Sequence, residues 1–169
     1  MKSKFSKISA ILLITLIIGE NVVRAKEIST PPSYTINSII SIPELKLSKK
    51  TYISDYKYVD ITGDKIKDHI ILVGTKQNKN DIFFDNLNII LQNGKTKKFT
   101  KTSIDINYAS GYNPTMFLSD LNGDKVPEVL VIMPTGGSGG MIIYSLISFK
   151  NNKIAYLFDP KKIQLWFRI

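Results

Sequence analysis

The sequence predicts an all-β protein built from two copies of one unit, and three observations support that fold class. After residue 48 the apolar segments are short and rich in Ile, Val, Phe and Tyr, which is typical of β-strands. No helical periodicity of useful length occurs in the same part of the chain. An acidic loop that contains glycine and is followed by an apolar run occurs twice, 60 positions apart.

The first 25 residues have the pattern of an export signal. Three lysines precede an apolar run from Ile8 to Gly19, and Val23-Arg24-Ala25 then supplies a signal-peptidase site. Because this run is shorter than the ~20 residues that span a bilayer as a helix, we expect a cleaved signal peptide, with an uncleaved anchor as the alternative. The expected location is therefore secreted or at the cell surface.

The charge of the chain argues against a nucleic-acid partner. The 23 basic and 14 acidic residues give a net charge of +9, and the signal contains four of the basic residues and one of the acidic ones. A net charge of +6 would therefore remain after cleavage. The basic residues are lysines apart from Arg24 and Arg168, whereas planar arginine side chains are preferred for reading phosphates and bases. We expect a basic surface that faces acidic wall polymers or phospholipid.

Two residue types limit the chemistry that is open to the protein. The chain has no cysteine, which excludes disulfides, thiolate metal sites and a cysteine nucleophile. It has a single histidine, His69, which excludes a multi-histidine zinc or copper site. A metal site in this protein would have to be built from oxygen ligands.

These patterns divide the chain into four regions. They are a signal peptide at 1–25, an N-terminal linker or edge segment at 26–48, a first repeat at 49–108 and a second repeat at 109–169. Within the N-terminal segment, residues 34–42 fit either a short helix or an edge strand, and Pro43 is expected to end that element.

Each repeat also predicts a β-hairpin after its apolar run. Asn-Gly and Asn-Asn pairs supply the left-handed backbone conformations that tight hairpin turns need. The expected strands are residues 87–92 and 96–100 around the turn at 93–95, and residues 142–150 and 154–158 around the turn at 151–153.

The two acidic loops carry oxygen atoms at alternate positions, which is the pattern that calcium needs. Calcium takes six to eight oxygen ligands, and alternation lets a curled chain direct every second side chain inward. Three carboxylates in each loop would repel one another unless a cation lay among them. The predicted ligands, with a backbone carbonyl at the fourth place of each set, are Asp60, Thr62, Asp64, Ile66 and Asp68, and Asp120, Asn122, Asp124, Val126 and Glu128.

Two other interpretations of these loops are an EF-hand and a pair of turns that bind no metal. An EF-hand would place a glutamate at loop position 12, where Ile71 and Val131 stand inside the apolar runs. Without that ligand we expect an affinity for calcium on the order of 10⁻⁴–10⁻³ M. The interpretation without a metal is a pair of Asx turns that lead into strands.

The second loop and the Val/Ile run after it resemble the calcium loop of FG-GAP/VCBS-type repeats, and the first loop is similar. The resemblance covers roughly residues 50–160. It implies that each unit is a four-stranded antiparallel sheet like a β-propeller blade, that the loop joins two strands, and that Ca²⁺ is the cofactor. The Phe-Gly and Gly-Ala-Pro elements of that family are absent at recognisable positions. Two units do not close a propeller of ~4 or more blades. The alternatives are therefore a truncated propeller, an open two-blade domain and a ring of several chains.

A glycine-rich segment follows the second apolar run. Its residues Gly136, Gly137, Ser138, Gly139 and Gly140 fit the Gly-x-Ser-x-Gly pattern of a hydrolase nucleophile elbow. An elbow opens a helix and is followed later in the chain by its histidine, whereas strand-like residues follow here and His69 comes earlier. We therefore favour a glycine-rich loop that holds a ligand or partner.

The sequence as a whole predicts a calcium-stabilised, secreted or cell-surface β-repeat module with a structural or binding role. The expected partners are a cell-wall polymer, a carbohydrate or a surface protein. An exported hydrolase that uses Ser138 is one alternative function. A structural component of a spore or envelope layer is the other.

Overall fold

The computed structural model describes residues 34–104 and 108–157, and it confirms the predicted all-β fold class. Within those two ranges there is no α-helix, and the only helical turns are the 3-10 helices η1 (Pro43–Leu45) and η2 (Lys150–Asn152). The predicted signal peptide and the first residues of the linker lie outside the described residues.

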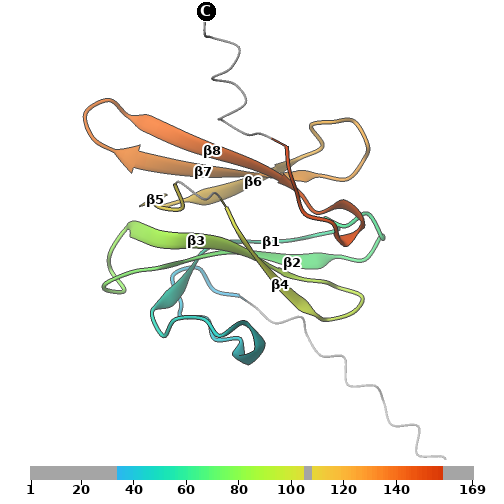
Figure 1. Ribbon diagram of the computed structural model, residues 1–169, viewed down its shortest axis with the longest axis horizontal. Helices are drawn as coiled ribbons and strands as arrows, with labels where there is room; N and C mark the ends of the chain where they lie inside the picture. The colour runs from blue at the N-terminus through green and yellow to red at the C-terminus, as the bar shows by residue number, and fades with distance from the viewer. Residues whose placement is uncertain (1–33, 105–107, 158–169) are drawn as a thin grey trace, which may run out of the picture. The chain divides into compact units, whose positions relative to one another are not determined.

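Two antiparallel sheets form the fold, and they lie as two layers in Figure 1. In both sheets the four main strands are neighbours in the order of the sequence, and each acidic loop joins the first two strands. The first sheet contains β1 (Thr51–Val59), β2 (Asp68–Thr75), β3 (Phe83–Gln92) and β4 (Phe99–Ser103), with β5 (Gly111–Tyr112) paired to β3. The second sheet contains β6 (Thr115–Ser119), β7 (Glu128–Gly136), β8 (Met141–Ser148) and β9 (Ala155–Tyr156).

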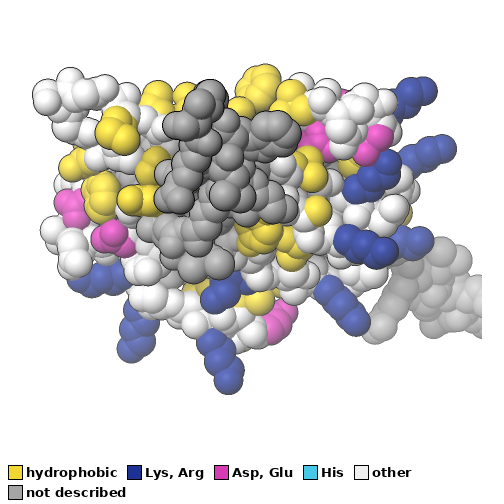
Figure 2. Space-filling model, turned by 45° about the horizontal axis from the view of Figure 1, so that its top comes forward, with side chains coloured by type: hydrophobic (Ala, Val, Ile, Leu, Met, Phe, Trp, Pro, Cys, Tyr) yellow, Lys and Arg dark blue, Asp and Glu magenta, His cyan; other side chains and the backbone are white. Residues whose placement is uncertain are grey.

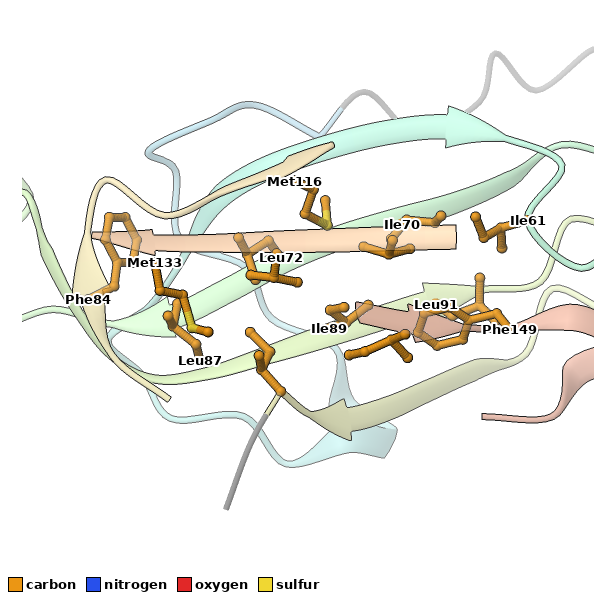
Figure 3. Close-up of a cluster of buried hydrophobic side chains, with 14 of the residues drawn as sticks. Ile61, Ile70, Leu72, Phe84, Leu87, Ile89, Leu91, Met116, Met133 and Phe149 are labelled. Carbon is orange, nitrogen blue, oxygen red and sulfur yellow. The ribbon is translucent and has the colours of Figure 1, made fainter. Parts of the chain in front are cut away.

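The main hydrophobic core lies between the two sheets. Leu72 and Ile89 of the first sheet belong to the same buried cluster as Val131 and Met133 of the second, and all four are fully buried (Figure 3). Burying an aliphatic side chain of this size contributes about 1.5–3 kcal/mol. The packing of one sheet on the other therefore buries apolar side chains from both sheets.

A second core covers the outer face of the first sheet. Its strand residues, among them Ile71 and Val73, pack against residues 34–47, in which Ile40 and Ile42 are buried. Residues 34–42 form neither a helix nor a strand, and their link to β1 includes a single bridge between Ile39 and Tyr52. The backbone is extended at Ile42, and Pro43 begins η1, so the conformation of the chain changes at the proline. Proline suits the first position of a helical turn because its φ angle is already fixed there.

The hairpin turn of the first repeat is longer than predicted. The Oδ1 atom of Asn93 accepts hydrogen bonds from the backbone N–H groups of Lys95 (3.0 Å) and Thr96 (2.7 Å), so β4 begins only at Phe99. In the second repeat, η2 occupies the turn and β9 is limited to two residues.

The central strands β2 and β7 differ in burial although both contain continuous apolar runs. β2 is buried along almost its whole length, as expected for a strand with both faces covered. β7 alternates between buried and half-buried residues from Val129 to Met133, so only one of its faces is covered by described residues.

Candidate functional site

The two acidic loops have the same backbone conformation. Gly63 and Gly123 have φ angles of 81° and 80°, and Lys65 and Lys125 have φ angles of 67° and 68°. These positive values place four residues in the left-handed region, which is open to glycine and uncommon for lysine. The loops are thus two copies of one structure at equivalent places in the two sheets.

The first carboxylate of each loop binds the backbone of its own loop. Asp60 accepts hydrogen bonds from the N–H groups of Gly63 and Lys65, both at 2.7 Å. Asp120 accepts the two corresponding bonds at 2.7 and 2.8 Å. These are Asx-type contacts, which hold the loop curled without any other ligand.

The last acidic residue of the first loop is fully buried and holds three donors. Oδ1 of Asp68 accepts a hydrogen bond from the N–H of Gly94 at 2.7 Å. Its Oδ2 accepts from the N–H of Ile61 and from the hydroxyl of Thr62, both at 3.2 Å. Asp68 therefore ties the loop to the β3–β4 turn and satisfies donors that have no access to water.

Glu128 plays the equivalent part in the second loop. Its side chain is buried, and its Oε2 accepts a hydrogen bond from the N–H of Leu121 at 2.8 Å. Its Oε1 accepts from the side-chain amide of Asn122 at 2.6 Å. In both loops the side chains at positions 3 and 9 are therefore joined directly to each other.

A lysine reaches the second loop from the other end of its repeat. The ammonium of Lys150 lies 2.9 Å from Oδ2 of Asp124, whose Oδ1 accepts from the N–H of Val126 at 2.9 Å. Both hydrogen bonds hold the pKa of Asp124 below its usual value, and the bond from Lys150 has the larger effect. In the first loop, Asp64 accepts the corresponding backbone bond from Ile66 at 2.9 Å.

The side chains of the predicted calcium ligands are engaged in hydrogen bonds within the fold. Residues 34–104 and 108–157 contain no group of three or more His, Asp or Glu side chains that could hold a metal. The loop carboxylates are instead directed to separate backbone donors, and the bond between positions 3 and 9 uses oxygens that the ion would need. The arrangement is that of two hydrogen-bonded turns, so calcium binding stays a prediction from the sequence.

The glycine-rich segment does not open a helix. Residues 137–140 form the turn between the antiparallel strands β7 and β8. The ring of Tyr112 lies beside Gly136, and Tyr112 pairs with Phe83 at the start of β3. His69 pairs with Gln92 at the opposite end of β3. Because β3 has ten residues, this end of the strand lies about 30 Å from Phe83. The structure therefore does not bring His69 to Ser138.

His69 is engaged in a cluster of tyrosines at the loop end of the first sheet. Its Nδ1 lies 2.7 Å from the hydroxyl of Tyr56, and the ring of Tyr58 is 4.5 Å from the imidazole. Burial, and secondly the charge of Lys97, lower the pKa of His69. The residue is thus part of the packing of the first sheet.

A cleft of about 550 Å³ is lined by residues 36 and 37, by the connection between β2 and β3, and by parts of β1 and β6. Lys76 and Asp55 line it, and both side chains are buried. The ammonium of Lys76 donates to the side chain of Asn37 and to two backbone carbonyls, and Asp55 accepts from the N–H of Met116 at 2.7 Å. These charged groups are satisfied within the fold, and Asp55 links the two sheets.

The outer face of the second sheet is the feature that the sequence analysis missed. Strands β6, β7 and β8 direct six apolar side chains away from the core, and cross-strand pairing places them in neighbouring rows. Phe117 is 56% exposed and Tyr144 is 44% exposed. Figure 2 turns this side of the molecule forward and shows several separate groups of hydrophobic side chains on it. We call these six residues the second-sheet outer face: Phe117, Leu130, Ile132, Ile142, Tyr144 and Leu146.

The two outer faces of the fold differ in what covers them. Residues 34–47 lie over the first sheet, whereas none of the described residues forms a buried cluster on the second-sheet outer face. The continuous apolar run in β7 could have indicated this face in the sequence. A strand with apolar side chains on both sides needs other residues to cover both of them.

Comparison with known proteins finds a relative for part of the chain. No protein-family profile matches the chain, and no solved structure matches it. The chain is 33% identical over 100 residues to the Bacillus subtilis (strain 168) protein described as "Uncharacterized protein YybI". The match covers 59% of this chain and 37% of that protein, so the chain spans little more than a third of the relative's length. Among the described residues no helix has the length and hydropathy to cross a membrane.

Proposed function

We propose that the chain is an exported β-repeat module with a binding role, and that it contacts its partner through the second-sheet outer face. The observation that carries this proposal is the set of six apolar side chains in register across three strands. Soluble proteins rarely expose a contiguous apolar patch beyond a few hundred Å², and larger patches mark interaction sites. Export is supported by the signal-like pattern of residues 1–25.

The chemistry of the face favours a polypeptide partner. Four of the six side chains are aliphatic, namely Leu130, Ile132, Ile142 and Leu146. Aliphatic side chains contribute through burial alone, which matches another apolar protein surface better than the hydroxyl-rich surface of a sugar polymer. Of the expected partners, a surface protein is therefore favoured, and a neighbouring subunit of a spore or envelope layer would make the same contact.

Site-specific photo-crosslinking in the native host tests this proposal. A photoreactive phenylalanine analogue placed at Phe117 should give an adduct heavier than the chain itself. The matched control is the same analogue at Ile36, which is equally exposed at 57% but lies on the side of the first sheet. Heavy adducts at neither position, or equally at both, would contradict a binding role for this face.

Calcium binding by the acidic loops is a second candidate role. The observation that favours it is that two loops 60 positions apart have φ angles within 1° at two paired positions and carry carboxylates at the same three positions. An ion would have to displace the ammonium of Lys150 from Asp124 and break the bonds between loop positions 3 and 9.

Calorimetry with calcium or a chelator tests this second candidate. With a Kd on the order of 10⁻⁴–10⁻³ M, ~10 mM calcium should stabilise the protein by about 1.4–2.7 kcal/mol per loop and raise Tm. Asp120→Asn should reduce the shift, and Lys150→Gln should enlarge it because that change removes the competing ammonium. An unchanged Tm at ~10 mM calcium would remove calcium from the proposed function.

A further inference from the structure

We propose that Lys76 and Asn37 condense within the folded chain to form an isopeptide bond between their side chains. The reaction joins Nζ of Lys76 to Cγ of Asn37 and releases the amide nitrogen of Asn37 as ammonia. The two residues line the cleft described above, and none of the residues that line this cleft belongs to the second-sheet outer face. The inference is therefore independent of the proposed function.

The fold brings these two side chains into contact from distant positions in the sequence. Lys76 directly follows β2, and its backbone N–H donates to the carbonyl of Lys50 at 3.3 Å. Asn37 lies in a turn before β1 with a φ angle of 64°, and its N–H donates to the carbonyl of Ile53 at 2.8 Å. Between these two backbone positions the ammonium of Lys76 donates to Oδ1 of Asn37. Because Cγ is bonded to that oxygen, the nucleophile and the carbon that it attacks are already neighbours, as a fast intramolecular reaction requires.

Two backbone carbonyls hold the lysine nitrogen in the orientation that the attack needs. Nζ of Lys76 donates to the carbonyl oxygens of Lys79 at 2.6 Å and of Asp81 at 2.9 Å. An ammonium has three N–H groups, and the third one points at Asn37. When that proton leaves, the lone pair of the neutral amine takes its place and faces Asn37, while the other two N–H groups stay bound to the carbonyls.

Burial of Lys76 favours loss of that proton. The residue is 4% exposed, and its nitrogen lies 4.8 Å from the ring centres of both Tyr52 and Phe84. The rings attract an ammonium but supply no counter-charge, and none of the ion pairs within residues 34–104 and 108–157 includes Lys76. Burial lowers the pKa of Lys76, and the charge of Asp81 opposes this with a smaller effect. Because a buried charge without a paired carboxylate is costly, conversion of the ammonium to an amide relieves the site.

Asp81 is the group that can move the protons. It lines the same cleft, and its charge is the largest influence on Lys76 after burial. Its Oδ2 accepts a hydrogen bond from the N–H of Asn78 at 2.7 Å, which fixes the carboxylate in the connection that follows Lys76. As a base it takes the proton of Lys76, and as an acid it returns a proton to the amide nitrogen of Asn37 as the C–N bond breaks. An ammonium and a primary amide thus become a secondary amide and an ammonium ion, and no oxidant or further reactant is consumed.

An isopeptide bond at this place gives the chain a covalent crosslink that it cannot obtain from cysteine, which is absent. The bond closes a loop between positions 37 and 76 and fastens residues 34–47 to the end of β2. These residues cover the outer face of the first sheet. A crosslink across a loop of this length restricts the unfolded chain and so stabilises the folded one.

Peptide mass spectrometry of the full-length chain, purified from its native host, tests the bond. We expect trypsin to leave Lys76 uncleaved and to release a branched peptide that contains both Asn37 and Lys76. Its mass should be that of its two parts less one ammonia, about 17 Da. Lys76→Met should restore two separate peptides and lower Tm by several degrees. Lys50→Met is the matched control and should keep the branched peptide, because Nζ of Lys50 also donates to a backbone carbonyl, that of Gln77 at 3.0 Å, but from an exposed position.

A second variant tests the reaction without removing either of the joined side chains. Asp81→Asn keeps an oxygen that can accept from Asn78, so the fold and its far-ultraviolet circular dichroism should be those of the parent. The fraction of chain with the branched peptide should fall several-fold, because the amide cannot transfer the protons. An unchanged fraction would overturn the part given to Asp81.

Two results would overturn the isopeptide bond itself. One is cleavage after Lys76 in the parent chain with both peptides at their unmodified masses. The other is a loss of ammonia that is confined to the peptide with Asn37, as a cyclic imide between Asn37 and Ser38 would produce. In either case a heavy crosslink at position 117 would leave the proposed function standing.

Discussion

Replacing Asp68 by alanine should lower the free energy of unfolding by about 3–5 kcal/mol. The carboxylate is fully buried and accepts hydrogen bonds from the N–H groups of Gly94 and Ile61 and from the hydroxyl of Thr62. The change leaves three donors without a partner, and each buried unsatisfied polar group costs about 1–3 kcal/mol. Urea unfolding followed by circular dichroism measures the loss.

Asp60→Ala is the matched control for this prediction. Asp60 also accepts two backbone hydrogen bonds, but it lies at the exposed side of the loop, where water can replace the lost acceptor. A loss of about 1 kcal/mol is expected, as for a side chain that caps exposed backbone groups. Equal losses for the two variants would show that Asp68 is not the residue that fastens the first loop to the fold.

The acidic loops show which part of a site the sequence can predict. The spacing of Asp, Gly and Asp predicted two equivalent curled loops, and their φ angles agree within 1° at both paired positions. The partners of the carboxylates were not predictable in the same way. Gly94 and Lys150 each lie 26 positions from the acid they contact, so only the packed fold brings them to Asp68 and Asp124.

The second-sheet outer face was missed for a related reason. The apolar runs of β2 and β7 are alike in sequence, and continuous runs of this kind are typical of strands that are buried on both faces. A sheet becomes buried on its second face only when another segment covers it. Residues 34–47 do this for β2, and their irregular path left no periodic signal in the sequence. The all-β class was predictable because strand composition is local, whereas the cover of each face is not.

Replacing Phe149 by alanine should lower the free energy of unfolding by about 3–5 kcal/mol, in the range of large aromatic truncations in a core. Phe149 is 1% exposed and follows β8 into the core between the sheets, where Ile61 and Leu91 lie close to it (Figure 3). The residue therefore fastens the end of the second sheet to the loop end of the first. Urea unfolding should show one transition shifted to lower urea, because the lost contacts belong to both sheets.

Phe117→Ala is the matched control, because the same side chain is removed from a position that is 56% exposed. The loss should be about 1 kcal/mol or less, since little buried apolar area disappears among the described residues. The comparison separates two roles of phenylalanine, one in the core at the end of β8 and one on the surface proposed for binding. If Phe149→Ala produced two separate transitions, the sheets would unfold independently, and the second sheet would not need the first as its support.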